Sequence, residues 1–295
     1  MIEFTGRIDT SFPGFLKIIR LYDDMEKSEG RENNVDFSRI IWIDANMCAP
    51  LRAVLHKLQA KGMQIGINER MDPKVQEIMQ KNSFLTDFGW KKVKDLNNTV
   101  YDCVRYKNDE SSLFDEYISS NFYRGGKGLP DMTPRLLNAF RESISEIFQN
   151  AVQHAESDLG IFACGQFFPV KRRLDFAIVD LGIGFRKRIL KMRNLDFTPV
   201  EAIIWAIEKF NTTRTVTGKK PGGHGLKLIK DFIRLNKGRM IIVSEGGYFE
   251  LGPDFTERKR LDPSFPGTVV IIEINTADTH AYCLSDELPI DGFSW

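Results

Sequence analysis

The chain has 295 residues, of which 42% are hydrophobic and 27% charged, and its formal net charge is +1. This length allows two domains that each bury a core, and the composition is typical of a globular protein. A net charge near zero gives no electrostatic reason to expect binding to nucleic acid or to an anionic membrane.

Neither a signal peptide nor a membrane-spanning run is recognisable in the sequence. Acidic and polar residues occupy the N-terminus, where a signal peptide would have an apolar core. The four cysteines are Cys48, Cys103, Cys164 and Cys283, without metal-ligand or redox spacing. Because this usage suits a reducing compartment, we expect a cytoplasmic protein that does not bind a membrane.

The first part of the chain alternates strand and helix signals. β-Branched and aromatic residues predict a strand at 35–43, and a short buried strand is expected at 63–67. A helix is predicted at 50–62, because a proline opens it and apolar residues then follow helical spacing. Another helix is predicted at 73–81. Strands that alternate with helices imply a sheet covered by helices, so residues 1–106 are expected to form an α/β domain.

The middle of the chain differs in composition. Residues 107–130 are charged and then rich in serine and glycine, which predicts a linker between domains. One short helix is expected within it, at Leu113–Ile118.

From residue 131 to residue 276 the pattern predicts a second α/β domain. A long helix begins at Thr133, with Pro134 in its first turn. The other expected elements are strands at 161–168, 174–179, 239–244, 248–251 and 268–274, helices at 199–210 and 226–235, a polar loop at 212–223 and a charged loop at 252–266. Residues 277–295 form a C-terminal tail to which the sequence assigns no role.

The long helix carries two stripes of residues. Its apolar stripe is expected to face a core and consists of Leu136, Phe140, Ile144, Ile147 and Ala151. Its polar stripe has a strict four-residue step and consists of Glu142, Glu146, Asn150 and His154. A solvated helix face explains the polar stripe equally well, although asparagine in the middle of a helix is mildly unfavourable.

Asp180 ends an apolar run and is followed by Leu-Gly-Ile-Gly184. Glycines at this point let the backbone turn sharply and approach a planar ligand. A carboxylate at a strand end can accept a hydrogen bond from an exocyclic amine, such as that of adenine. A plain turn after a strand explains this segment alone about as well, and the third glycine of a Rossmann fingerprint is missing.

A second glycine cluster consists of Gly222, Gly223 and Gly225 and leads into the predicted helix at Leu226. Backbone amides of a glycine turn, together with a helix N-terminus, favour phosphate binding. A flexible loop before an ordinary helix start is the alternative. The sequence contains no Walker A pattern, so a P-loop enzyme is not expected.

Taken in order, these segments resemble the motifs of the GHKL superfamily, whose ATPases have a Bergerat fold. The similar segments are 146–154 (N box), 180–184 (G1 box), 223–226 (G2 box) and Gly267-Thr268, which is similar to the motif near the base of the adenine pocket. The resemblance covers roughly residues 133–274. It implies a Bergerat-fold α/β sandwich over residues 131–276.

The resemblance also implies ATP and Mg²⁺ as ligands. Asn150 would bind the metal, which keeps water and phosphate oxygens as its other ligands. Glu146 would act as the general base, and Asp180 would hold adenine with help from Thr268 through a water. The other implied nucleotide-binding residues are Gly182, Gly184, Gly222, Gly223, His224, Gly225 and Leu226, with Lys219 and Lys220 reaching the phosphates from a lid at 212–223.

Residues 35–51, with the helix and strand that follow, resemble the STAS fold of anti-sigma-factor antagonists. In that family a phosphorylated serine stands in the turn between strand and helix. Asn46 occupies the matching position here, so this turn would not be switched by phosphorylation. An unrelated α/β scaffold remains the alternative.

We therefore expect a two-domain α/β protein that acts as a magnesium-dependent ATPase or kinase-like regulator. Two alternatives stay open: a non-enzymatic, ATP-gated interaction module, and a serine/threonine kinase of the anti-sigma-factor type that acts on another protein. Each implies a regulatory protein partner. A homodimer is also left open, because many GHKL proteins dimerise.

Overall fold

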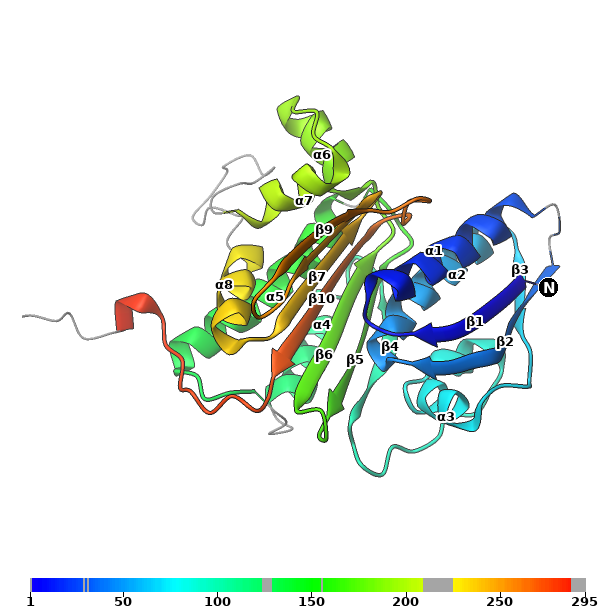
Figure 1. Ribbon diagram of the computed structural model, residues 1–295, viewed down its shortest axis with the longest axis horizontal. Coiled ribbons are helices and arrows are strands. Elements are labelled where there is room, and N and C mark those ends of the chain that lie inside the picture. Colours follow the sequence, from blue (N-terminus) through cyan, green and yellow to red (C-terminus); the bar gives the residue numbers. More distant parts are fainter. Residues whose placement is uncertain are drawn as a thin grey trace, which may run out of the picture.

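A computed structural model describes residues 2–28, 30, 32–123, 129–154, 156–208 and 225–287. Over these residues the protein is a mixed α/β structure with a parallel three-stranded sheet, an antiparallel seven-stranded sheet and eight α-helices (Figure 1). Within the same ranges, no helix combines the length and apolar character that crossing a membrane requires.

The smaller sheet has the strand order β1-β2-β3, and all its pairs are parallel. Its strands are β1 (Ile2–Ile8), β2 (Glu32–Ile43) and β3 (Gln64–Ile67), and its helices are α1 (Phe12–Lys27), α2 (Cys48–Ala60) and α3 (Pro73–Lys81). Parallel neighbours need crossover connections, and α1 and α2 supply them. The predicted helix 73–81 is confirmed with its bounds. The sequence pattern had not resolved β1 and α1 as separate elements.

The larger sheet has the strand order β4-β5-β6-β10-β7-β8-β9. Its strands are β4 (Val100–Tyr106), β5 (Ile161–Phe168), β6 (Arg173–Asp180), β7 (Arg239–Ser244), β8 (Gly247–Leu251), β9 (Thr256–Arg260) and β10 (Thr268–Asn275). The prediction of a loop over 252–266 missed β9. That strand is a solvent-exposed edge with the sequence Thr-Glu-Arg-Lys-Arg, so it carries no apolar alternation to reveal it.

One face of the larger sheet is covered by helices. The helices of this layer are α4 (Ser111–Ile118), α5 (Pro134–His154), α7 (Pro199–Ile207) and α8 (Gly225–Asn236). α4 lies in the predicted linker, yet its Phe114 and Ile118 are fully buried in this layer. Helix α6 (Gly184–Arg193) follows β6 and projects from the end of the sheet (Figure 1).

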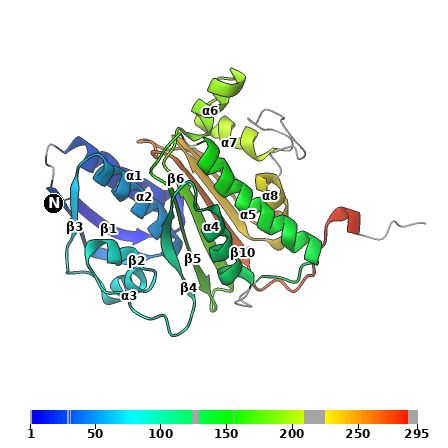
Figure 2. The ribbon, with the colours of Figure 1, turned by 180° about the vertical axis from the view of Figure 1, so that it is seen from behind.

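The opposite face of the larger sheet packs on the N-terminal part of the chain (Figure 2). Buried residues of α1 and α2, among them Phe15 and Val54, form one continuous cluster with Phe162, Val179 and Ile271 of the sheet. β4, which the sequence-based division assigned to the N-terminal domain, is an edge strand of the larger sheet. Because the two parts share a core, the predicted division into two domains is not confirmed.

Candidate functional site

Three polar side chains lie together at one end of the larger sheet. Asp180 ends β6, Thr268 begins β10 and Ser244 ends β7, and Thr268 pairs in register with both of the others. The hydroxyls of Ser244 and Thr268 are 3.1 Å apart. The Gly182 amide donates to Asp180 Oδ1 at 2.8 Å. The sheet end therefore presents one carboxylate beside two hydroxyl groups.

Asp180 is held in an environment that disfavours its charge. Burial raises the pKa of Asp180 to about 6, although the Gly182 amide and the ammonium of Lys57 act in the opposite direction. Lys57 comes from α2, and its Nζ donates to the carbonyl of Pro266 at 3.0 Å and of Leu181 at 3.4 Å. Lys57 of the N-terminal part thus contacts the backbone just after β6 and just before β10. No sequence motif predicted this role of Lys57, because it lies 123 positions before Asp180.

Glycines allow the close backbone approach at this end of the sheet. A Cβ atom at Gly267 would lie 2.0 Å from the carbonyl oxygen of Asp180, so no larger residue fits there. Gly184 has φ +79°, in the region that favours glycine, and begins α6. The Glu245 carboxylate then accepts hydrogen bonds from the amide of Arg186 at 3.0 Å. The segment 180–184 therefore turns a strand into a capped helix, which the sequence pattern did not predict.

The apolar stripe of α5 is confirmed, since all five of its residues are buried and four of them belong to the core cluster between the helices and the sheet. On the polar stripe, Glu142 is exposed whereas Glu146 and Asn150 are half-buried. The backbone of α5 extends to His154, whose side chain lies outside the described residues. The Glu146 carboxylate accepts a hydrogen bond from the Gly225 amide at 2.9 Å.

This contact brings two segments predicted from the sequence together at the first turn of α8. A Cβ atom at Gly225 would lie 2.9 Å from Glu146 Oε2 and 3.0 Å from the carbonyl oxygen of Ser143, so the helix start packs tightly on α5. Leu226 follows and packs at the edge of the helical layer. The other predicted phosphate-binding residues, Lys219, Lys220, Gly222, Gly223 and His224, lie outside the described residues.

A short connection places the C-terminal end of α5 near the sheet end that carries Asp180. Its last turn is followed by a connection of six residues, 155–160, and then by Ile161, which pairs directly with Asp180. Asn150 stands in that last part of α5, and Figures 1 and 2 show α6 and α7 at the same end of the molecule. In the described part of the chain, no group of three or more histidine, cysteine, aspartate or glutamate residues is placed to hold a metal ion. Asn150 as a magnesium ligand therefore remains a prediction.

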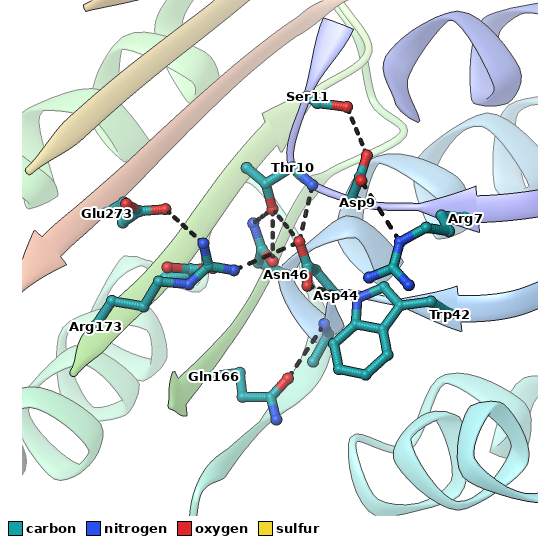
Figure 3. A network of polar contacts seen from close by, with 12 residues as sticks. Arg7, Asp9, Thr10, Ser11, Trp42, Asp44, Asn46, Gln166, Arg173 and Glu273 are labelled. Atoms are coloured by element: carbon teal, nitrogen blue, oxygen red, sulfur yellow. Dashed lines mark hydrogen bonds and ion pairs between the residues drawn. The ribbon is translucent and has the colours of Figure 1, made fainter. Parts of the chain in front are cut away.

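A second polar cluster lies on the opposite face of the sheet, where β1 and β2 end (Figure 3). Asp44 accepts hydrogen bonds from the Thr10 amide at 2.9 Å and from Trp42 Nε1 at 2.9 Å. Asn46 is fully buried and contacts the Thr10 hydroxyl. Asn46, for which the sequence resemblance predicted the STAS phosphoserine position, thus lies inside the core, between the N-terminal part and the sheet.

Charged residues of the sheet complete this cluster. Arg173 contacts Asp175 at 3.1 Å, Glu273 at 3.1 Å and Asp44 at 3.6 Å. Asp175 is fully buried, and burial followed by the charge of Glu273 raises its pKa well above the usual range. A set of charges therefore links the residue that follows β2 to β6 and β10, and no sequence motif predicted it.

The fold also gathers three cysteines that are scattered in the sequence. Cys48, Cys103 and Cys164 are buried where α2 meets β4 and β5. The Cys164 thiol donates to the carbonyl of Ala45 at 2.9 Å, and burial raises its pKa well above the usual range. A buried thiol of this kind is a small core residue rather than a reactive nucleophile.

Asp180→Asn is expected to stabilise the protein at neutral pH. An acid whose pKa is raised in the folded state loses its proton at a higher pH there than in the unfolded state. The folded state therefore binds more protons than the unfolded state between pH 3.8 and about 6. The free energy of unfolding of the wild-type protein therefore falls as pH rises through that window. The asparagine variant has no titrating group at this position, so its free energy of unfolding does not show this decrease.

We expect the variant to be more stable by roughly 1–3 kcal/mol at about pH 7.5, and by about 1 kcal/mol less at about pH 5. Urea unfolding of both proteins at the two pH values measures this difference. An advantage of equal size at both values would contradict a perturbed Asp180.

Comparison with known proteins leaves this geometry without an assigned family: no protein-family model matches the chain, and no curated protein matches it.

Proposed function

We propose that the protein binds ATP with Mg²⁺ as GHKL proteins do, and uses it either for hydrolysis or for regulation. The observation that carries the proposal is the sheet end, where Asp180 and Thr268 stand beside the Gly182–Gly184 turn. The contact of Glu146 with Gly225 supports it, because it joins the polar stripe of α5 to the start of α8.

In this proposal each residue contributes a chemistry that its surroundings permit. The Asp180 carboxylate accepts a hydrogen bond from the exocyclic amine of adenine. The N-terminus of α8 offers backbone amides and a positive dipole end to the phosphates. Asn150 holds the metal through its amide oxygen, and the bound ion neutralises phosphate charge. Glu146 orients a water molecule or a hydroxyl group and accepts its proton.

A non-enzymatic, ATP-gated module is the second candidate, and the Glu146 contact favours it. A carboxylate that holds the first amide of α8 has a structural role, and that role needs no proton transfer. Nucleotide phosphates that compete for the same amide would free α8 from α5. Binding would then change a protein surface without turnover.

A kinase that acts on its own N-terminal part is disfavoured. Asn46 lies on the face of the larger sheet opposite α5, is fully buried, and has no hydroxyl group. A phosphate acceptor at this turn would be out of reach of a nucleotide held between α5 and the sheet end. If the protein is a serine/threonine kinase, its acceptor belongs to another protein.

Asp180→Ala is expected to weaken ATP binding by about 10- to 100-fold, because a hydrogen bond to a charged group contributes roughly 1.5–3 kcal/mol. Guanine carries an oxygen where adenine carries the amine, so GTP should bind poorly to the wild-type protein. The variant should lose this preference. Equilibrium dialysis with labelled ATP and GTP in the presence of Mg²⁺ measures both.

Asp254→Ala is the matched control, since Asp254 is an exposed carboxylate in the loop before β9. It should bind ATP as the wild-type protein does. Undetectable ATP binding by the wild-type protein, or equal affinities in all three proteins, would refute the proposed site.

A further inference from the structure

A second candidate site lies at the edge strand β4, on the face of the larger sheet that packs on the N-terminal part. A groove of about 600 Å³ is formed where α2, the segment Ser83–Asp87 and the edge strand β4 meet. This volume falls in the range of sites that bind small molecules. Because α2 belongs to the N-terminal part and β4 to the larger sheet, the groove joins the two parts of the protein.

His56, Arg105 and Lys107 are among the side chains that line this groove. His56 is half-buried, with its ring centroid 5.6 Å from that of Phe162. Arg105 is anchored by a hydrogen bond from its Nε to the Leu159 carbonyl at 2.7 Å. Lys107 is exposed at the rim. Neither Arg105 nor Lys107 forms an ion pair with the residues that the structure describes.

The carboxylates around the groove already have partners. Asp87 pairs with Arg52 at 2.5 Å, and Arg52 also donates to the Cys103 carbonyl. Asp102 pairs with Lys92 at 2.6 Å and accepts from the Ser83 hydroxyl at 3.1 Å.

The last of these carboxylates, Glu110, accepts from the Lys107 backbone amide at 2.8 Å. Four positive side chains, Arg52, Lys92, Arg105 and Lys107, stand against three carboxylates, Asp87, Asp102 and Glu110, so one net positive charge remains at the groove.

The surroundings of His56 agree with this balance. Burial lowers the pKa of His56, the positive charges of Arg105 and Arg52 lower it further, and only Asp87 acts in the opposite direction. A neutral imidazole beside two guanidinium groups gains a proton readily once an anion neutralises them.

We propose that this groove binds a small anionic ligand, with its phosphate or carboxylate group seated among His56, Arg105 and Lys107. Arg105 offers a planar donor fork, and the Arg52–Asp87 pair fixes the wall beside it. A ligand held there contacts both α2 and β4. Its binding strengthens the junction between the N-terminal part and the sheet independently of ATP.

Histidine NMR on the full chain tests this site with inorganic phosphate and with citrate as separate probes. The His56 resonance is assigned from its absence in His56→Gln. We expect saturable shifts of that resonance and a rise in its pKa when the probe binds. A response to phosphate alone assigns a phosphorylated ligand, and a response to citrate alone assigns a carboxylate.

Arg105→Gln and Lys107→Gln should each weaken the response by about tenfold, whereas Arg20→Gln, at an exposed arginine of α1, should not change it. Lys107 is an exposed side chain, so its variant tests the site even if Arg105→Gln fails to fold. Asp180→Ala should keep the response, which separates this site from the proposed nucleotide site. The proposal would be overturned if neither probe shifts the His56 resonance. It would also be overturned if Arg105→Gln and Lys107→Gln both show the same shifts as the wild-type protein.

Discussion

Replacing Glu146 by glutamine is expected to slow phosphate release from ATP by about 10²- to 10⁴-fold, the usual contribution of a general base. ATP affinity should change by no more than about threefold. Glutamine keeps the length of the side chain and a carbonyl oxygen that can accept the hydrogen bond from the Gly225 amide. It therefore removes the proposed proton acceptor and keeps the link between α5 and α8.

The structure explains why alanine is the less informative substitution. Glu146→Ala would remove the proton acceptor and the Gly225 contact together, so a loss of turnover would have two causes. Glu142→Gln is the matched control, because Glu142 lies one turn earlier on the same stripe and is exposed.

Labelled ATP, with free phosphate and protein-bound label measured separately, gives the readout. ATP bound without turnover by the wild-type protein would favour the gated module. Turnover that persists unchanged in Glu146→Gln would refute the assignment of the base.

Arg173→Met is expected to destabilise the protein by about 3 kcal/mol. Removing one partner of a buried ion pair costs roughly 3–5 kcal/mol, because the other charge stays buried without compensation. Arg173 keeps 20% of its side-chain exposure, which favours the lower end of that range. Its removal takes this partner from Asp175 of β6 and from Asp44, which follows β2, whereas Glu273 of β10 keeps Arg239 as a partner at 3.2 Å. Figure 3 shows Arg173 between Asp44 and Glu273.

Two further variants distinguish the loss of the Arg173 charge from a nonspecific loss of stability. Arg172→Met changes an exposed neighbour, and its free energy of unfolding should stay within about 0.5 kcal/mol of wild type. Asp175→Asn removes a carboxylate whose raised pKa already disfavours its charge, so it should be neutral or stabilising at neutral pH.

Without Arg173 the pKa of the buried acids in the folded state rises further. The folded state then binds extra protons at acid pH, so the deficit of Arg173→Met should shrink between about pH 7.5 and pH 5. Urea unfolding measures all three variants. A deficit below about 1 kcal/mol in Arg173→Met would mean that the cluster does not hold the two parts together.

Local sequence patterns predicted the regular elements well where one face of an element is buried. The helix at 73–81 and the strand at 161–168 match the structure, and the apolar stripe of α5 faces the core as expected. Helical and strand periods follow from backbone geometry, so a few neighbouring residues suffice to reveal them. Elements without this contrast were missed, as the charged edge strand β9 shows.

The partners of each element were harder to predict. Leu113–Ile118 was recognised as a short helix, but not as part of the helical layer that covers the larger sheet. β4 pairs with β5 across more than fifty intervening residues, and nothing in its own sequence specifies that neighbour. Pairing depends on which apolar faces are left to bury once the rest of the chain has folded.

The sequence by itself determined the glycine turn after Asp180, the strand that ends at Asp180 and the polar stripe of α5, because each depends on residues close together in the chain. Only the tertiary structure decided that Lys57 supports the Asp180 strand end, that Glu146 contacts Gly225, and that Asn46 is buried. It also decided that the N-terminal part and the larger sheet share one core. These are contacts between distant segments, and their geometry is fixed by long-range packing that local patterns do not encode.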